Sequence, residues 1–521
     1  MRLLNDVHKD TLHKLTVLVV LLLFVSFLIP IGQSPVNLYA SFTDDFYYYL
    51  KIAQSFTRGD GLSYTSHIYT NGYQPFFQFF IVLLVYIAHL IGAPELVFIR
   101  FVMALVFMIA SLVLLRQLRP RGYAATFFFL LGLFGYYIIS YSGMESLFIV
   151  PVLTYFVFKL STGSISVNRA ALLVALAFFI RIDSFVITLP LFFYYFSQHI
   201  PRRGRSAMLA PFVIMGLPVA LYLGVNYFLY HSSFPVSGLA KTVVKLGGVN
   251  GASLKSFAFY FPYNVYNVAV TGLFILVALT GDFKAKRYFH LLALVTLLFY
   301  ILTAVRSDWA LWAWYFYPVP PLAFMLSAQG GALFSAPNPR LAGLNRFIYA
   351  AAAFAAVVVL FSFVIWAFYS LPLYKTSSEG EGKVDILHIG GLHIKEFEEH
   401  HKGVYAMGDR AGIVGYLIKS PLIQLEGLVM DKEYMNRLSK TEKLYDLLHA
   451  YNVNYYIASN PTRLDDSTYV VKEPAQSHGL SHQITDTIHW KICDSLTLSS
   501  KGVFTRKEND RFQTVIFEVP R

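Results

Sequence analysis

Apolar runs of membrane-spanning length recur along the first 370 residues, and this pattern constrains the fold more than any motif does. A helix needs roughly 20 mainly apolar residues to cross a bilayer. Of the 521 residues, 56% are hydrophobic and only 14% are charged, and the mean hydropathy is +0.53. Soluble globular domains contain about 25% charged residues. The chain is therefore predicted to be an α-helical polytopic membrane protein.

The apolar runs predict about eleven crossings and one further segment that is either re-entrant or short. That segment is residues 76–92, and the sequence leaves open whether it crosses. Residues 169–181 and 184–198 are short for full crossings, so the bilayer beside them would have to be thinner. The predicted crossings are 15–32, 96–115, 122–141, 145–160, 169–181, 184–198, 207–230, 265–280, 287–304, 313–329 and 345–370.

The sequence divides into a membrane domain, residues 1–370, and a C-terminal soluble domain, residues 371–521. The soluble domain has 18 Lys and Arg against 20 Asp and Glu, whereas the remainder has 24 against 10. Strand-like runs alternate with a helical pattern, which predicts an α/β domain. The predicted strands are Val404–Met407, Leu422–Leu425 and Tyr455–Ala458, and the predicted amphipathic helix is Lys432–Tyr451.

Basic loops predict the orientation, because cytoplasmic loops carry an excess of Lys and Arg. Four clusters of basic residues lie on the same side of the membrane only if residues 76–92 dip into the bilayer and return without crossing it. This places the N-terminus in the cytoplasm and the C-terminal domain outside the cell membrane. The excess of basic charge is then a matter of topology, and no nucleic-acid partner is expected. The clusters are Arg2, Lys9 and Lys14; Arg116, Arg119 and Arg121; Arg202, Arg203 and Arg205; and Lys284, Lys286 and Arg287.

Two adjacent carboxylates, Asp44 and Asp45, precede an aromatic helix that is predicted over residues 46–56. We expect that helix to lie at the membrane interface with Tyr47, Tyr48 and Lys51 on its wetter face. Carboxylates at a membrane face are costly to desolvate, so the pair is a candidate site. The alternative is that these are ordinary solvated loop charges. The same topology places further charged residues at the outer face, among them Glu145, Arg181, Asp183, Lys241 and Arg306.

Several short motifs follow the acidic pair in a fixed order. The motifs are Gly59-Asp60-Gly61-Leu62, Thr70-Asn71-Gly72-Tyr73-Gln74-Pro75, Ser142-Gly143-Met144-Glu145-Ser146, Arg181-Ile182-Asp183, Pro235-Val236-Ser237-Gly238-Leu239-Ala240-Lys241 and Trp314-Tyr315. Through these motifs the chain resembles the bacterial and archaeal glycosyltransferases of the C superfamily (GT-C), including protein mannosyltransferase-like and arabinofuranosyltransferase-like members. The C-terminal part resembles that of a subset of such proteins through Gly408-Asp409-Arg410-Ala411-Gly412 and Leu425-Glu426-Gly427-Leu428. The resemblance implies transfer of a sugar from a polyprenyl-phosphate carrier to an extracytoplasmic glycan, lipid or protein.

Glycosyl transfer from a lipid phosphate needs a base for the acceptor hydroxyl and cations for the leaving phosphate. Asp45 or Asp44 is the candidate base, with Asp45 preferred although helical register cannot be decided from the sequence. Glu145 is the second acid, placed to position the acceptor or a metal. The pair Asp44 and Asp45 could instead hold a divalent cation, Mg or Mn, as some relatives do. The candidate substrate-binding residues are Tyr73, Gln74, Arg181, Asp183, Lys241, Arg306, Trp314 and Tyr315.

Two other classes of function compete with an enzyme. A transporter or flippase of lipid-linked sugars would have charges near the middle of the membrane and inverted repeats. A structural or assembly subunit would not need an acidic pair. Trp314 and Tyr315 could belong to an interfacial aromatic belt rather than stack on a sugar ring. For the C-terminal domain, an accessory or acceptor-binding role is expected, because residues 408–412 are too loose a motif for a nucleotide loop.

Overall fold

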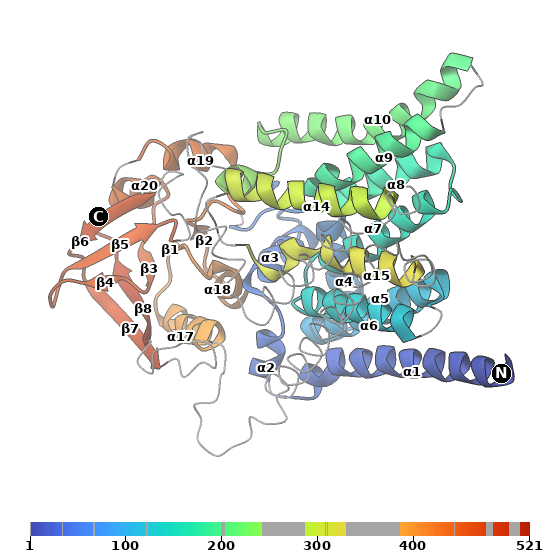
Figure 1. Ribbon diagram of the computed structural model, residues 1–521. Helices are drawn as coiled ribbons and strands as arrows, with labels where there is room; N and C mark the ends of the chain where they lie inside the picture. Colours follow the sequence, from blue (N-terminus) through green and yellow to red (C-terminus); the bar gives the residue numbers. More distant parts are fainter. Residues whose placement is uncertain are drawn as a thin grey trace.

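The computed structural model is mainly helical, with the strands gathered at the C-terminal end of the chain (Figure 1). Two of the predicted crossings, 265–280 and 345–370, lie outside the described residues. The structure describes residues 2–33, 35–65, 68–120, 123–199, 204–241, 287–307, 309, 311–329, 386–441, 443–475, 483–499 and 511–521.

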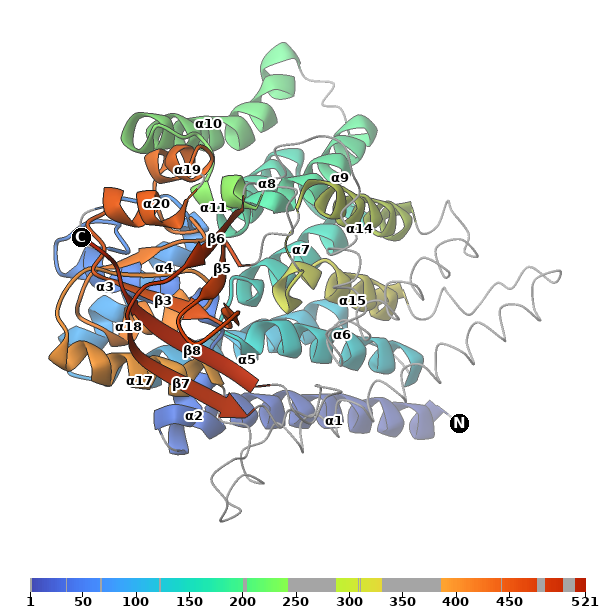
Figure 2. The same ribbon diagram turned by 90° about the vertical axis from the view of Figure 1, so that its left-hand side faces the viewer.

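The helices of the N-terminal part form a bundle in which α1 and α10 lie on opposite sides (Figures 1 and 2). Their apolar stretches match most of the predicted crossings. In a bilayer every backbone polar group must be hydrogen-bonded within the protein, so long apolar runs form helices. The helices are α1 (Arg2–Leu28), α2 (Pro35–Ala40), α3 (Asp44–Thr57), α4 (Pro75–Leu90), α5 (Glu95–Leu118), α6 (Tyr123–Tyr141), α7 (Ser146–Ser161), α8 (Val167–Ile180), α9 (Phe185–Gln198), α10 (Gly204–Tyr230), α11 (Val236–Ala240), α14 (Arg287–Arg306) and α15 (Val319–Gln329).

Four helical stretches among the described residues are long and apolar enough to cross a membrane: Thr11–Gly32, Glu95–Leu118, Met208–Tyr230 and Arg287–Arg306. Many of their large apolar side chains are exposed, as lipid contact requires. Shorter apolar helices accompany them, and α4, which contains the ambiguous segment 76–92, is one of these. The protein is a membrane protein, and the count of about eleven crossings stays a prediction.

The C-terminal part contains a five-stranded mixed sheet with the order β2-β1-β3-β8-β7. Strand β1 pairs in parallel with β2 and β3, whereas β8 runs antiparallel to β3 and β7. A second antiparallel sheet has the order β4-β5-β6. The elements are α17 (Ile386–His400), β1 (Tyr405–Met407), α18 (Ala411–Leu417), β2 (Leu422–Gln424), α19 (Lys432–Leu438), α20 (Leu444–Ala450), β3 (Tyr455–Ser459), β4 (Thr462–Arg463), β5 (Tyr469–Glu473), β6 (Ile484–Ile488), β7 (Ile492–Ser499) and β8 (Arg511–Glu518).

The single helix predicted over Lys432–Tyr451 is wrong, because the structure has two short helices there. Helix α19 ends at Leu438 and α20 begins at Leu444. The backbone N–H of Leu444 donates to the Asp486 carboxylate of β6 at 2.9 Å. A contact from a distant strand therefore provides the start of α20, and local helical periodicity contains no sign of it.

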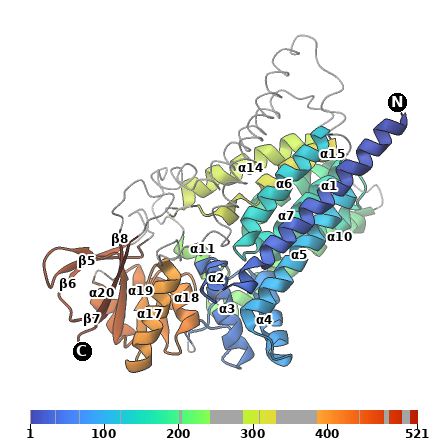
Figure 3. The ribbon, with the colours of Figure 1, turned by 90° about the horizontal axis from the view of Figure 1, so that it is seen from below.

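Helix α3 lies between the membrane helices and the C-terminal part (Figure 3). Tyr47 and Tyr48 are buried, so the prediction that they form a wet helix face is wrong. Helix α18 packs on α3, and Lys51 Nζ donates to the carbonyl of Ile418 at 3.3 Å. Gly72 lies so close to this part that an added Cβ would be 1.9 Å from the carbonyl oxygen of Leu428.

Candidate functional site

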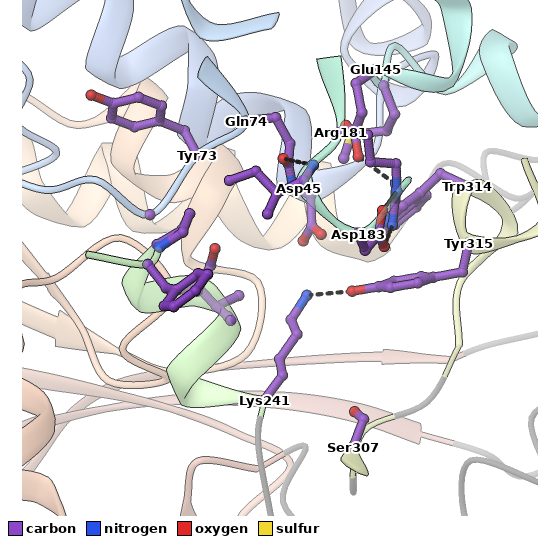
Figure 4. Close-up of a pocket in the computed structure, with 18 of the residues that line it drawn as sticks. Asp45, Tyr73, Gln74, Glu145, Arg181, Asp183, Lys241, Ser307, Trp314 and Tyr315 are labelled. Atoms are coloured by element: carbon purple, nitrogen blue, oxygen red, sulfur yellow. Dashed lines mark hydrogen bonds and ion pairs between the residues drawn. The ribbon is translucent and has the colours of Figure 1, made fainter. Parts of the chain in front are cut away.

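A cavity of about 370 Å³ lies where several helices of the membrane part meet the C-terminal part. Its charged residues come from helix ends: Asp45 is the second residue of α3, Glu145 precedes α7, Arg181 follows α8 and Arg306 ends α14. Of the predicted site residues, the cavity lining includes Asp45, Tyr73, Gln74, Glu145, Arg181, Asp183, Lys241, Trp314 and Tyr315 (Figure 4). Arg306 lines the cavity as well.

Asp45 presents a carboxylate to the cavity without a fixed partner. The side chain is half-buried, and no hydrogen bond or ion pair joins it to any residue that the structure describes. Burial raises the pKa of Asp45, while the nearby positive charge of Lys241 opposes the rise. A carboxylate with a raised pKa is a stronger base than an ordinary one, which suits it to accept a proton.

Asp44 faces away from the cavity and into the C-terminal part. Its two carboxylate oxygens accept the backbone N–H groups of Gly412 at 3.0 Å and Ile413 at 2.8 Å. Burial raises the pKa of Asp44 to about 7, although these two hydrogen bonds act against the rise. This placement corrects the hypothesis that either carboxylate could meet a substrate, since only Asp45 lines the cavity.

The acidic pair is also poorly arranged to hold a divalent cation. Both oxygens of Asp44 are occupied by N–H donors, and Asp45 points about 100° away around the helix, into the cavity. Within the described ranges, no group of three or more His, Cys, Asp or Glu side chains converges as a metal site. The donor set therefore does not fit the predicted Mg or Mn ion, which would need several oxygen ligands.

Arg181 is held between two carboxylates. Its Nη1 donates to Glu145 Oε1 at 2.5 Å, while Nε and Nη2 donate to the two oxygens of Asp183 at 2.8 and 3.0 Å. The guanidinium is buried, and its single charge is offset by two acids. Arg181 therefore fixes the shape of this wall, and its charge is less available to a substrate phosphate than sequence reasoning suggested.

Lys241 and Arg306 supply positive charge that is not offset in this way. Lys241 Nζ donates to the hydroxyl of Tyr315 at 3.3 Å and lies 5.4 Å from the ring centre of Trp309. Arg306 is exposed at the cavity mouth. Neither forms an ion pair with an acid among the described residues. Two such cations in one cavity favour an anionic ligand.

The aromatic residues form one wall of the cavity. The rings of Trp312 and Trp314 are stacked with their centres 5.9 Å apart and 11° between their planes. Tyr315 lies between Arg181 and Lys241. The Arg181 guanidinium is 4.7 Å from the ring centre of Tyr315, and the Tyr315 hydroxyl accepts a hydrogen bond from Lys241. This wall offers flat apolar faces beside charged groups, an arrangement that suits a sugar ring.

Asn71 is a buried residue whose positioning role was not predicted. The sequence analysis includes it only within the motif Thr70-Asn71-Gly72-Tyr73-Gln74-Pro75. In the structure, Asn71 Oδ1 accepts the backbone N–H of Val236 at 3.1 Å, and Nδ2 donates to the carbonyls of Ser232 and Phe234, each at 3.3 Å. These bonds hold the loop before α11, and therefore the segment that ends in Lys241.

Gln74 fixes the turn that contains Arg181 and Asp183. Its Oε1 accepts the backbone N–H of Ile182 at 3.0 Å, and its own backbone N–H donates to the hydroxyl of Tyr49 at 3.3 Å. Gln74 therefore acts on the site by positioning.

A second cavity adjoins the first at Tyr73, which lines both. It has a volume of about 660 Å³ and lies between α4, α8 and α10. Phe79 and Leu83 in its wall are half exposed on the outer surface of α4, so the cavity opens toward the bilayer. Its other lining residues are Leu62, Pro75, Phe76, Phe80, Phe179, Tyr222, Val225, Asn226, Leu229 and Tyr230.

The C-terminal part completes the wall of the first cavity. Leu428 and Val429 line it, and the close approach of Gly72 to Leu428 seals this edge. Just outside lies Glu426, which is buried and has one oxygen, Oε1, without a hydrogen bond in the described structure. Burial, with Asp409 and Asp45 nearby, raises the pKa of Glu426 well above its usual range. None of this was foreseen from the motif Leu425-Glu426-Gly427-Leu428.

Comparisons with known proteins give structural similarity only. No family model matches the chain, and no curated protein matches it. The arabinofuranosyltransferase AftD from mycobacteria is similar at 13% identity with a TM-score of 0.46, over 98% of this chain and 40% of that one. ArnT from Cupriavidus metallidurans, solved with undecaprenyl phosphate, is similar at 13% identity with a TM-score of 0.48, over 91% and 97%. The chain thus spans about 40% of the length of AftD.

Proposed function

We propose that this protein is a membrane-embedded glycosyltransferase of the GT-C type that uses a polyprenyl-phosphate-linked sugar. One observation carries the proposal. Asp45, a carboxylate without a hydrogen bond or ion pair to any residue that the structure describes, shares a cavity with the cations Lys241 and Arg306, and that cavity adjoins an apolar one that opens toward the bilayer. A base, a phosphate site and a route for a lipid tail are the three parts that such a transfer needs.

The proposed reaction is a single displacement at the anomeric carbon. The acceptor hydroxyl gives its proton to Asp45, and its oxygen forms a bond to that carbon from the face opposite the phosphate. The bond between the anomeric carbon and the phosphate oxygen breaks, and its electron pair leaves with the polyprenyl phosphate. The configuration of the sugar is inverted. Lys241, with Arg306, stabilises the negative charge that builds on the leaving phosphate.

The polyprenyl chain would lie in the apolar cavity. Tyr73 lines both cavities, so a phosphate near Lys241 and a chain beside Phe79 can belong to one molecule. Trp314 and Tyr315 would contact the sugar ring. The buried set Glu145, Arg181 and Asp183 would position the acceptor and hold the cavity open. No step passes through a metal ion.

The acceptor is proposed to approach from the extracytoplasmic side, where the C-terminal domain would lie. The basic loops predict this orientation, with the enzyme in the cell membrane and its N-terminus in the cytoplasm. Leu428 and Val429 of the C-terminal part line the cavity, so that part is well placed to contact the acceptor. A role in synthesis of the cell envelope follows from that location.

A flippase of lipid-linked sugars is the second candidate. Transporter sites lie near the middle of the bilayer, at the interface of structural repeats. Here the charged residues Asp45, Glu145 and Arg181 all stand at helix ends, and the C-terminal part covers them. This placement at one boundary favours an enzyme.

The test uses the purified full-length protein in nanodiscs with a panel of polyprenyl-phosphate-linked hexoses and pentoses. Release of polyprenyl phosphate and formation of a new glycoside are measured together. We expect Asp45→Asn to lower turnover by about 10²–10⁴-fold. Asp60→Asn is the matched control, because Asp60 is partly exposed and pairs with Arg58. Translocation of a lipid-linked sugar without any glycoside product would support the flippase instead.

A further inference from the structure

A third cavity lies at the opposite end of α1 and α5 from the candidate functional site. It has a volume of about 510 Å³ and is lined by His13, Val17, Leu112, Leu115, Arg116, Arg119 and Pro120. The two helices are candidate membrane spans, which begin at Thr11 and end at Leu118 respectively. The cavity is therefore at a membrane boundary. The other end of α5 starts at Glu95, which accepts from Gln54 of α3 at 3.0 Å.

The walls of this cavity combine an apolar floor with a cationic rim. Val17, Leu112 and Leu115 form the floor, and Arg116 and Arg119 stand at the rim with His13. Of the described residues that line it, none is acidic. Both arginines are exposed, and neither forms an ion pair with a residue that the structure describes. Two guanidinium groups at one cavity, without an acidic partner among the side chains that the structure describes, favour an anion.

The backbone turns Arg119 toward this rim. Its φ angle is 45°, in the left-handed region that residues other than glycine adopt infrequently. Its Nε donates to the carbonyl of Arg116 at 3.2 Å. That bond holds the guanidinium of Arg119 beside Arg116 and leaves its two terminal nitrogens available. The planar donor array of arginine matches the oxygens of a phosphate.

We propose that this cavity binds the phosphate of an anionic phospholipid at the membrane boundary. A soluble anion would gain nothing from the floor, and a lipid without a phosphate would gain nothing from the rim. The lipid chains would run from the floor along the exposed apolar side chains one turn further into the bilayer, Leu21 of α1 and Ile109 of α5. Basic cavities between transmembrane helices recognise anionic headgroups in this way.

A matched control separates a built site from general attraction between basic loops and an anionic membrane. Arg169 is exposed, lies in the first turn of α8 and forms no ion pair with a described residue. Helix α7 runs from Glu145 at the candidate functional site to the opposite end, where α8 begins. Arg169 therefore stands at the same boundary as Arg116 with the same charge, but outside the cavity.

The experiment measures binding of phosphatidylglycerol to the delipidated full-length protein in detergent, by native mass spectrometry and by the shift in melting temperature. We expect saturable binding that weakens about tenfold or more in Arg116→Gln/Arg119→Gln. We expect less than a twofold change in Arg169→Gln. Val17→Trp fills the floor without removing charge. It should weaken binding of phosphatidylglycerol and leave binding of inorganic phosphate unchanged.

Three results would overturn the proposal. Equal weakening in Arg169→Gln would show general charge attraction. Equal binding of phosphatidylcholine, whose ammonium group cancels the charge of its phosphate, would show that the cavity does not select an anionic headgroup. Binding of inorganic phosphate as tight as that of phosphatidylglycerol would remove the role of the floor, and the ligand would then be a free anion. Because the readout is lipid binding, the outcome is independent of glycosyl transfer.

Discussion

The carboxylate of Asp44 accepts the backbone N–H of Gly412 at 3.0 Å, across 368 positions of the chain. The neighbouring N–H of Ile413 donates to the same carboxylate at 2.8 Å. An added Cβ at Gly412 would lie 2.2 Å from the backbone oxygen of Asp44, so only glycine allows this approach. Asp45 is the next residue, and it lines the cavity. The C-terminal part is thereby fastened to the helix that presents the proposed base.

Asp44→Asn and Asp45→Asn should give opposite results. The amide at position 44 has one accepting oxygen where two N–H groups need one each, so docking of the C-terminal part should weaken. Leaving a buried donor unpaired costs about 1–3 kcal/mol. We expect Asp44→Asn to lower the melting temperature and speed proteolysis between the two parts. Asp45→Asn should retain wild-type stability and lose turnover.

The controls for this pair are Asp60→Asn and Gly412→Ala. Gly412→Ala removes the close approach without changing charge, and it should reproduce the loss of stability seen in Asp44→Asn. If Asp44→Asn instead keeps full stability and loses turnover as Asp45→Asn does, then Asp44 acts on the substrate and its assignment to docking of the C-terminal part is incorrect.

Lys241→Ala should weaken the use of the donor more than it affects folding. A hydrogen bond to a charged group contributes about 1.5–3 kcal/mol, which corresponds to roughly ten- to hundredfold in donor KM. Lys241→Arg keeps the charge and should recover part of this loss. Lys440→Ala removes an exposed lysine and serves as the control. An unchanged KM in Lys241→Ala would move the proposed phosphate contact to Arg306.

Arg181→Ala should destabilise the protein, because it leaves the buried carboxylate of Glu145 and the partly exposed carboxylate of Asp183 without the cation between them. Removing one partner of a buried ion pair costs about 3–5 kcal/mol. Glu145→Gln alone leaves Arg181 paired with Asp183 and should be milder. The measurement is the melting temperature of purified variants, followed by turnover per folded molecule. A stable Arg181→Ala protein that has lost only donor binding would show that Arg181 contacts the phosphate directly.

The sequence predicts the helices of the membrane part well and their surroundings poorly. Run 96–115 became α5 (Glu95–Leu118) and run 207–230 became α10 (Gly204–Tyr230), because composition alone decides where a long apolar helix can form. The sequence does not predict the different roles of Asp44 and Asp45. Adjacent residues on a helix point about 100° apart. Which direction faces the cavity depends on residues 411–413, and no local pattern reports that.

Contacts with the distant C-terminal part also explain why the prediction of a wet face for Tyr47 and Tyr48 is wrong. Tyr47 and Tyr48 fit an interfacial helix by periodicity, yet the C-terminal part covers them. Asn71 was missed for a related reason, since its partners Ser232 and Val236 are more than 160 positions away. Polar residues that act by positioning leave a weak signal, whereas charged residues in an apolar sequence leave a strong one.

Cysteine labelling tests the orientation that the basic loops predict. In a Cys493→Ser background, Gln117→Cys should be protected from an impermeant thiol reagent in intact cells, and Lys440→Cys should be labelled. Cys493 is the only cysteine of the chain, so the background is free of thiols. Permeabilised cells are the control, and both positions should react there. Labelling of Gln117→Cys from outside would reverse the predicted topology.

Glu473→Gln should stabilise the protein at pH 8 and have little effect at pH 5. Burial raises the pKa of Glu473 from 4.5 to about 8, and Asp409 adds to the rise. Between these two values the unfolded chain has released the proton that the folded protein still holds, so stability falls as the pH rises. The amide cannot ionise, and its oxygen can still accept the hydroxyl of Tyr456, which lies 2.9 Å from Glu473 Oε1.

The measurement for Glu473→Gln is the melting temperature of variant and wild type from pH 5 to pH 8. The difference between them should grow in favour of the variant across this window, because only the wild type loses the contribution of Glu473. Glu399→Gln neutralises an exposed glutamate of α17 and is the control, with a difference that should stay small throughout. A difference for Glu473→Gln that is constant with pH would mean that this carboxyl group has the same pKa in both states, and burial of its charge would then cost nothing.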